Sequence, residues 1–244
     1  MKTLHPIAFA LSVSLLAGVA AAHTTIPTQS TEGLRSNGYL RIGHGCEDGA
    51  RDVVAQSVVF PTDAPVLSSS DPNQTPASLD QVIEQGGLAG LPNLVQDRSV
   101  FNVQSEKTDG NGNAIGFVGS RGRLRQGLIG QIPFEFTGPN FLAESCAKRL
   151  LIQVAIADLC AVGSQPVRGD KLNLWIPDNG SQLATKGAAA SIDGIGEPAT
   201  LIVNRDLLNN PLGGGCGGGF DLTVTPSATQ VDRDLPVPHL WTPR

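Results

Sequence analysis

The sequence predicts an all-β fold, a β-sandwich built from short strands that are joined by long glycine- and proline-rich loops. The chain of 244 residues contains 29 glycines and 17 prolines, a content that helical proteins rarely have. Its apolar segments are short, and turn residues separate them. No long stretch repeats apolar residues at the 3.6-residue period of an amphipathic helix, so we expect strands to form the core.

Residues 1–22 have the three parts of a secretory signal peptide. Lys2 supplies the positive charge, residues 7–19 are mostly apolar, and three alanines at the end provide the small residues that signal peptidase accepts. A transmembrane helix needs about 20 apolar residues, more than this run contains. We therefore expect cleavage between Ala22 and His23, a secreted or periplasmic mature chain, and no transmembrane segment after removal of the signal.

The first expected strands lie on either side of a glycine-rich turn. Tyr39–Ile42 alternates in the way that a half-buried strand does, and residues 43–46 (GHGC) interrupt it. The next strand, Asp52–Phe60, is β-branched and apolar, and Pro61 ends it. Residues 61–80 are rich in Pro, Ser, Asp and Asn, which predicts a loop that covers an edge of the sheet.

The middle of the chain predicts a β-hairpin. Ser99–Gln104 and Ala114–Val118 flank the turn residues 109–113 (DGNGN). This turn also resembles the start of an EF-hand calcium loop, but Ala114 and Ser120 stand where that loop requires Gly and Glu. A hairpin tip is therefore the better interpretation.

The remaining strands are expected in the second half of the chain. Leu150–Ile156 is almost entirely apolar, which predicts burial on both faces. Residues 232–244 are proline-rich without a repeating apolar pattern, and we expect them to lie extended over the domain or to move freely. The other expected strands are Ile132–Phe136, Leu172–Ile176, Ala199–Val203 and Phe220–Val224.

Four cysteines lie in the mature part of the chain, and an even number in an exported protein predicts two disulfides. Their spacing leaves three connectivities open, of which we favour Cys46–Cys160 with Cys146–Cys216. None forms a Cys-x-x-Cys pair, so neither thiol redox chemistry nor a thiolate metal site is indicated.

Charge and motifs weigh against several classes of function. The formal net charge is −5 and no basic cluster is present, which is unfavourable for nucleic-acid binding because contacts with phosphates supply most of its affinity. The chain has no Gly-x-Ser-x-Gly nucleophile motif and no phosphate-binding loop. Enzymes that depend on those motifs are therefore not indicated.

Cleavage after Ala22 would give His23 two nitrogen donors, the α-amine and the imidazole. An amine and an imidazole titrate at about 7.7–8.0 and about 6.5, so both offer lone pairs near neutral pH. Together they can close a chelate ring, and nitrogen donors of this kind favour Cu(II). His44 is a further candidate ligand, although turn histidines beside a disulfide are more often structural. The geometry of the chain also allows His239 to reach back as a second imidazole.

These residues resemble the start of the YcnI-like family of exported copper-binding proteins. The likeness begins with Ala22-His23-Thr24-Thr25 and with the strand Tyr39–Ile42 that leads into His44-Gly45-Cys46. It continues in Val53–Pro61, Gly116–Gly119, Glu135-Phe136, Val154–Cys160 and Trp175-Ile176-Pro177, and so spans roughly residues 23–177. Residues 178–244 form a C-terminal extension, which we expect to add strands to the same domain and a proline-rich tail.

The resemblance implies an immunoglobulin-like β-sandwich that holds one Cu(II) through His23, with a carboxylate and a nearby tryptophan completing the site. Glu32 and Glu135 are the candidate acids. In some members the tryptophan lies just before the first strand, whereas residues 32–38 of this chain contain none.

The sequence therefore predicts a copper chaperone or scavenger without turnover, whose partners are the copper ion and a copper-accepting protein. One alternative is a copper monooxygenase of the histidine-brace kind, which needs His44 or His239 within reach of His23. Another is a structural or adhesive module without a metal, in which His23 is incidental and the loops form the working surface.

Overall fold

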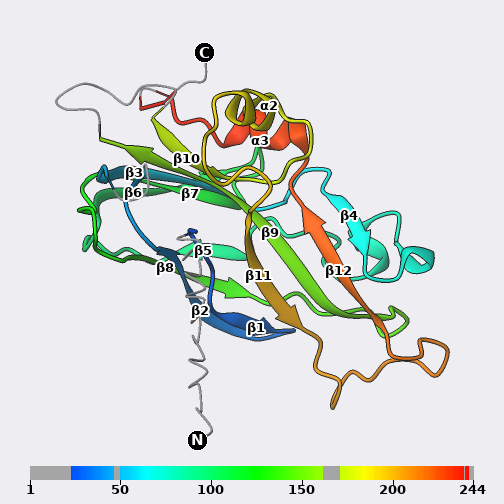
Figure 1. Ribbon diagram of the computed structural model, residues 1–244. Helices are drawn as coiled ribbons and strands as arrows, with labels where there is room; N and C mark the ends of the chain where they lie inside the picture. The colour runs from blue at the N-terminus through cyan, green and yellow to red at the C-terminus, as the bar shows by residue number, and fades with distance from the viewer. Residues whose placement is uncertain (1–22, 47–49, 162–170, 239, 242–244) are drawn as a thin grey trace, which may run out of the picture.

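The computed structural model describes residues 23–46, 50–161, 171–238 and 240–241, and the predicted signal peptide and His239 lie outside these ranges. Within them the chain is a β-sandwich with a third layer of helices (Figure 1). A three-stranded sheet packs against one face of a nine-stranded sheet, and two helices cover the opposite face of the larger sheet. The prediction of an all-β sandwich with long loops is confirmed.

The smaller sheet has the order β2-β8-β5, with bounds β2 (Arg35–Ile42), β8 (Gly130–Thr137) and β5 (Pro92–Leu94). The larger sheet follows the path β1-β11-β9-β3-β7-β6, to which β10, β12 and β4 are attached. Its strands are β1 (Gln29–Thr31), β3 (Val53–Val59), β4 (Val66–Ser69), β6 (Phe101–Thr108), β7 (Ala114–Gly122), β9 (Ala147–Cys160), β10 (Leu172–Trp175), β11 (Ala199–Asn204) and β12 (Phe220–Thr225).

Strand β9 is the long central strand of the larger sheet. Its first half pairs antiparallel with β11 and parallel with β12, and its second half pairs antiparallel with β3 and β10. Successive side chains of a strand point to opposite faces. Ile156 accordingly belongs to the core between the sheets and Ala157 to the core under the helices. Asp158 therefore points into the sandwich, where it is 1% exposed.

Each predicted strand overlaps an observed one and extends beyond it by at most two residues at either end, and the predicted hairpin is β6 and β7. The prediction of a loop at residues 61–80 is wrong for Val66–Ser69, because this segment pairs as β4 with β12. Two short 3₁₀ turns, η1 (Pro72–Gln74) and η2 (Leu79–Gln81), follow it. The pairing partner comes from the far end of the chain, which no local pattern reveals.

Two helices were not predicted. Ser181 caps the amino-terminal end of helix α2 (Gln182–Ala189), and Ser227 caps that of helix α3 (Ala228–Asp234). Each serine hydroxyl accepts a hydrogen bond from a backbone N–H of the first turn. The expectation that residues 232–244 are extended or mobile is therefore wrong for their first three residues. Both helices are short, and packing on the larger sheet stabilises them more than their own propensity can.

The favoured disulfide connectivity is confirmed. Cys46–Cys160 joins the turn after β2 to the end of β9, and Cys146–Cys216 joins the start of β9 to a glycine-rich loop. Two disulfides are typical of proteins that fold in an oxidising compartment. Among the residues that the structure describes, no helix is long and apolar enough to span a bilayer.

Candidate functional site

The segment that follows His23 links the two sheets. Thr25 exchanges two backbone hydrogen bonds with Arg41 of β2, with N···O distances of 3.0 and 2.8 Å. Ile26 then enters the core between the sheets, and β1 pairs in parallel with β11 of the larger sheet. The position of His23 is therefore set by backbone pairing that begins two residues after it.

Five side chains meet at this point, His23, Thr24, Asp158, Trp175 and Glu197, and we term them the N-terminal cluster. The His23 Nε2 atom lies 2.7 Å from Oε2 of Glu197. The imidazole also packs on the Trp175 indole, with 5.0 Å between ring centroids and a tilt of 45°. The side chain of His23 remains 31% exposed and that of Glu197 54%, so a solvent-borne ligand can reach both.

Asp158 lies beneath this surface and connects two members of the cluster. Its Oδ2 atom accepts hydrogen bonds from the Thr24 hydroxyl (2.6 Å) and from the Trp175 indole N–H (2.7 Å). Its Oδ1 atom accepts a third from the Gln56 amide (2.7 Å) on the neighbouring strand β3. Burial raises the pKa of the Asp158 carboxyl, while these donors and the charge of His44 act in the opposite direction.

Glu197 reaches His23 because a short loop runs alongside β10. Within it, Ile195 forms a parallel bridge with Ile176, and the Gly196 N–H donates to the Ile176 carbonyl at 2.8 Å. Gly194 has a φ of +94°, and a Cβ atom there would lie 2.5 Å from Cε3 of Trp175. A glycine at this position therefore lets the loop pack directly on the indole that supports His23.

The chemistry of the cluster depends on the imidazole atom that stays available. With the proton on Nε2, the bond to Glu197 fixes the tautomer in which Nδ1 keeps its lone pair. Metal-binding histidines commonly donate their other ring N–H to a carboxylate in this way. Within the described ranges, no group of three or more His, Cys, Asp or Glu side chains is arranged to hold a metal ion. A metal at His23 would therefore need the α-amine as a further donor.

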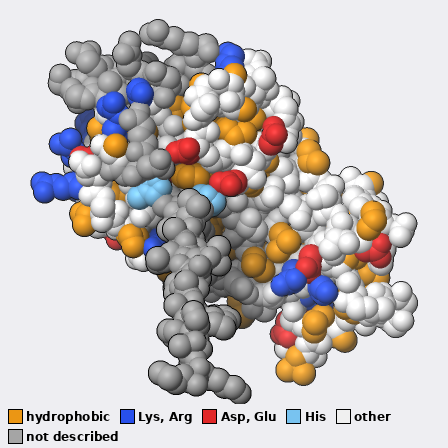
Figure 2. Space-filling model, viewed as in Figure 1, with side chains coloured by type: hydrophobic (Ala, Val, Ile, Leu, Met, Phe, Trp, Pro, Cys, Tyr) orange, Lys and Arg blue, Asp and Glu red, His pale blue; other side chains and the backbone are white. Residues whose placement is uncertain are grey.

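His44 lies in the turn that leads into the first disulfide. Its Nδ1 atom faces the carbonyl oxygen of Gly45, and its charge acts on Asp158. A Cβ atom at Gly45 would meet the carbonyl oxygen of Arg51 at 2.0 Å, so this glycine is needed for close packing of the turn. Figure 2 shows the described histidine side chains in one region of the surface, with acidic side chains beside them.

The two glutamates predicted as copper ligands have partners elsewhere. The Glu32 carboxylate accepts backbone N–H groups of Phe141 and Asp206 at 2.9 and 2.6 Å, and so ties three loops together. Glu135, on β8, forms an ion pair with Arg35 across the smaller sheet at 3.4 Å. The acid that contacts His23 in the structure is Glu197.

Sequence reasoning missed Asp158 and Glu197. Asp158 had a usable signal, because it is the one charged residue in the apolar run from Leu150 to Cys160 and a buried carboxylate requires partners. Glu197 had none, since it lies in a glycine-rich loop that tertiary contacts bring to His23. Trp175 was noted only as part of a segment that resembles the copper-binding family, and it was not predicted as a site residue.

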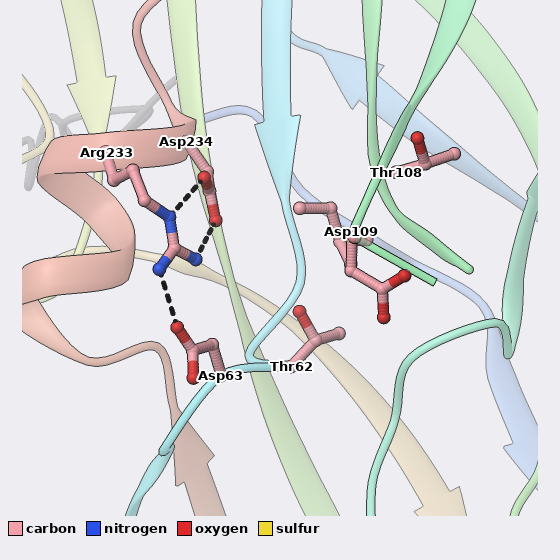
Figure 3. Close-up of a pocket in the computed structure, with 8 residues that line it drawn as sticks. Thr62, Asp63, Thr108, Asp109, Arg233 and Asp234 are labelled. Carbon is pink, nitrogen blue, oxygen red and sulfur yellow. Dashed lines mark hydrogen bonds and ion pairs between the residues drawn. The ribbon is translucent and has the colours of Figure 1, made fainter. Parts of the chain in front are cut away.

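A polar pocket of about 360 Å³ lies between the β6–β7 hairpin tip and the end of α3 (Figure 3). Arg233 in this pocket bonds both oxygens of Asp234 and one of Asp63, each at 2.7 Å. The Asp109 carboxylate accepts backbone N–H groups of its own turn, as expected of a hairpin tip. Arg233 thus pairs with Asp234 and Asp63, and Asp109 bonds its own turn. We interpret the pocket as a polar contact between the hairpin tip and α3.

No protein-family model and no curated protein matches the chain. Among solved structures, it is similar to one reported as "an uncharacterized protein from Nocardia farcinica" that "reveals an immunoglobulin-like fold". The TM-score is 0.41 at 10% sequence identity, and the match covers 75% of this chain and 99% of the other.

Proposed function

We propose that this chain is an exported Cu(II)-binding protein, a chaperone or scavenger that holds the ion with the amino terminus created at His23. The observation that carries the proposal is the docking of His23 between Glu197 and Trp175, with Nε2 engaged and the imidazole partly open to solvent. A histidine that merely followed a cleavage site would not need a fixed ring orientation.

The α-amine and Nδ1 of His23 would hold the copper, and the amine would release its proton to solvent as the ion binds, so that ligand exchange needs no general acid or base. Glu197 would supply the carboxylate that the family resemblance calls for, and it would orient the imidazole through Nε2. Trp175 supplies the tryptophan that residues 32–38 lack. Its indole is 3% exposed and packs against the imidazole, with 5.0 Å between the ring centroids.

One observation supports the histidine-brace alternative. The charge of His44 acts on Asp158, and Asp158 in turn bonds the indole on which His23 packs. The described histidine side chains also lie in one region of the surface (Figure 2). The number of nitrogen ligands on a bound Cu(II) distinguishes a single-histidine site from a brace.

The test is a Cu(II) titration of protein whose first residue is His23, followed by calorimetry and electron paramagnetic resonance. A matched form acetylated at the α-amine of His23 removes that donor and keeps every side chain. Glu197→Gln, which keeps the size of the side chain and removes its charge, reports on the carboxylate. We expect one-to-one binding that acetylation abolishes and that Glu197→Gln weakens about 10- to 100-fold.

Two amine-plus-imidazole nitrogens in the spectrum would support the single-histidine site, and a third nitrogen that His44→Ala removes would indicate a brace. Equal and weak binding by the native and the acetylated forms would refute the copper proposal. The interpretation as a structural or adhesive module would then stand.

A further inference from the structure

The amino-terminal segment and the buried carboxylate of Asp158 depend on each other. Thr24 is 1% exposed, although it follows the residue at which the mature chain is expected to begin. Its hydroxyl reaches across the sandwich to β9, 134 positions further along the chain, and bonds Asp158 at 2.6 Å. A residue so near a chain end is buried only where a specific contact holds it.

Asp158 needs these donors because a carboxylate is costly to bury without hydrogen bonds. It has three, and two of them, the Thr24 hydroxyl and the Trp175 indole N–H, bond the same oxygen atom. If the amino-terminal segment left its place, Oδ2 would lose one of its two donors. Docking of the amino-terminal segment therefore supplies one of the hydrogen bonds that stabilise the buried carboxylate.

The same oxygen also fixes the support on which His23 rests. The indole N–H of Trp175 points to Asp158, which orients the ring whose centroid lies 5.0 Å from that of the imidazole. Gln56 on β3 holds the other oxygen, and Cys160, two residues along β9, is tied by its disulfide to Cys46. Asp158 is thus anchored in the sheet, while it accepts hydrogen bonds from Thr24, which follows His23, and from Trp175, on which His23 packs.

We propose that Asp158 is a positioning residue that docks the segment beginning at His23, by accepting hydrogen bonds from both Thr24 and Trp175. The effect of Asp158 on Cu(II) affinity rests on the proposed function, whereas its role in docking the segment does not. Without these bonds the imidazole would have to be ordered at the moment of binding, and the ordering would lower the affinity.

The test uses the mature protein that begins at His23, and its first readout needs no metal. Nuclear Overhauser contacts between the His23 imidazole and the Trp175 indole report docking, and solvent exchange of the Trp175 indole N–H reports the bond to Asp158. A Trp241→Phe background leaves Trp175 as the single tryptophan. The affinity for Cu(II) is measured separately.

Thr24→Val removes the hydroxyl and keeps the β-branched shape. Its matched control is Thr225→Val, because the Thr225 hydroxyl makes a similar 2.7 Å bond to Gln153 of the same strand β9, away from the cluster. We expect Thr24→Val to lose the imidazole–indole contacts and to speed indole exchange about tenfold, which corresponds to about 1.4 kcal/mol. Thr225→Val should match the native protein in both readouts.

Two substitutions of Asp158 separate hydrogen bonding from shape. Asp158→Asn can keep its bonds to Thr24 and Trp175 if the Gln56 amide turns over, so it should retain the contacts. Asp158→Leu has a similar size and no acceptor, and it should lose them. If Asp158→Leu does not fold, the comparison of Thr24→Val with Thr225→Val decides the question.

Native contacts in Thr24→Val, or equal behaviour of Asp158→Asn and Asp158→Leu, would overturn the positioning role. A native protein that shows the contacts and binds no Cu(II) would refute the proposed function and leave the docking role standing. With binding present, Thr24→Val should raise the Kd about tenfold relative to Thr225→Val.

Discussion

Replacement of Gly194 by alanine should damage both the stability of the domain and the support of His23. Gly194 has a φ of +94°, and a Cβ atom added there would lie 2.5 Å from Cε3 of Trp175 and 2.6 Å from the carbonyl oxygen of Leu174. The backbone carbonyl of a paired strand cannot move aside easily. The loop would have to lift, and it would take Glu197 away from His23.

The expected loss of stability has three parts. A positive φ costs a non-glycine residue about 1–2 kcal/mol, and forced repacking adds about 1–3 kcal/mol. Alanine returns about 0.5 kcal/mol by restricting the unfolded chain. The net loss for Gly194→Ala is about 2–4 kcal/mol, which lowers the Tm of a domain of this size by roughly 4–16 °C.

Two other glycines isolate these contributions in thermal and urea unfolding. Gly180 has a φ of +79° with no atom within 4 Å of an added Cβ, so Gly180→Ala should lose about 1 kcal/mol from backbone strain alone. Gly214 has neither feature, and Gly214→Ala should stay within about 0.5 kcal/mol of the native protein. Equal unfolding temperatures of Gly194→Ala and Gly180→Ala would refute the predicted clash of an added Cβ with Trp175 and Leu174.

Three further predictions concern the framework around the cluster. Replacing both cysteines of the Cys46–Cys160 disulfide, which are 114 positions apart, by alanine should lower the free energy of unfolding by about 2–4 kcal/mol, and an unchanged urea midpoint would contradict this. Burial lowers the pKa of Lys107 to about 8, so between about pH 8 and about pH 10.5 the unfolded chain binds more protons than the folded one. The stability of the native protein relative to Lys107→Met should therefore rise with pH across this window, by up to about 3 kcal/mol, and urea titrations that give a constant difference would refute the assignment. Arg205 is 4% exposed and donates to several backbone carbonyls through its planar group. Arg205→Lys cannot reproduce this fork and should lose about 2–4 kcal/mol, whereas a calorimetric Tm within about 1 °C of native would show that the carbonyls find other donors.

The sequence by itself determined most of the fold. Strands such as Asp52–Phe60 and Leu150–Ile156 could be predicted because alternation and β-branched composition are local properties of a chain that will lie in a sheet. The favoured cysteine pairing was also correct. Local patterns failed where a partner distant in sequence makes the element, as for Val66–Ser69, which becomes a strand only beside β12.

Of the candidate site, the sequence singled out His23, because a histidine that follows the predicted signal peptide would have two donors after cleavage, wherever the chain folds. It placed the acids at Glu32 and Glu135, since those residues lie in the segments that resemble the copper-binding family. Only the tertiary structure decided that Glu197 contacts His23, and that Thr24 and Trp175 share one oxygen of Asp158. The Thr24–Asp158 bond joins residues 134 positions apart, the Trp175–Asp158 bond joins two neighbouring strands, and Glu197 lies in a loop with no pattern of its own. The donor chemistry is thus a property of single residues, whereas the geometry of the cluster depends on how β9, β10 and the amino-terminal segment pack together.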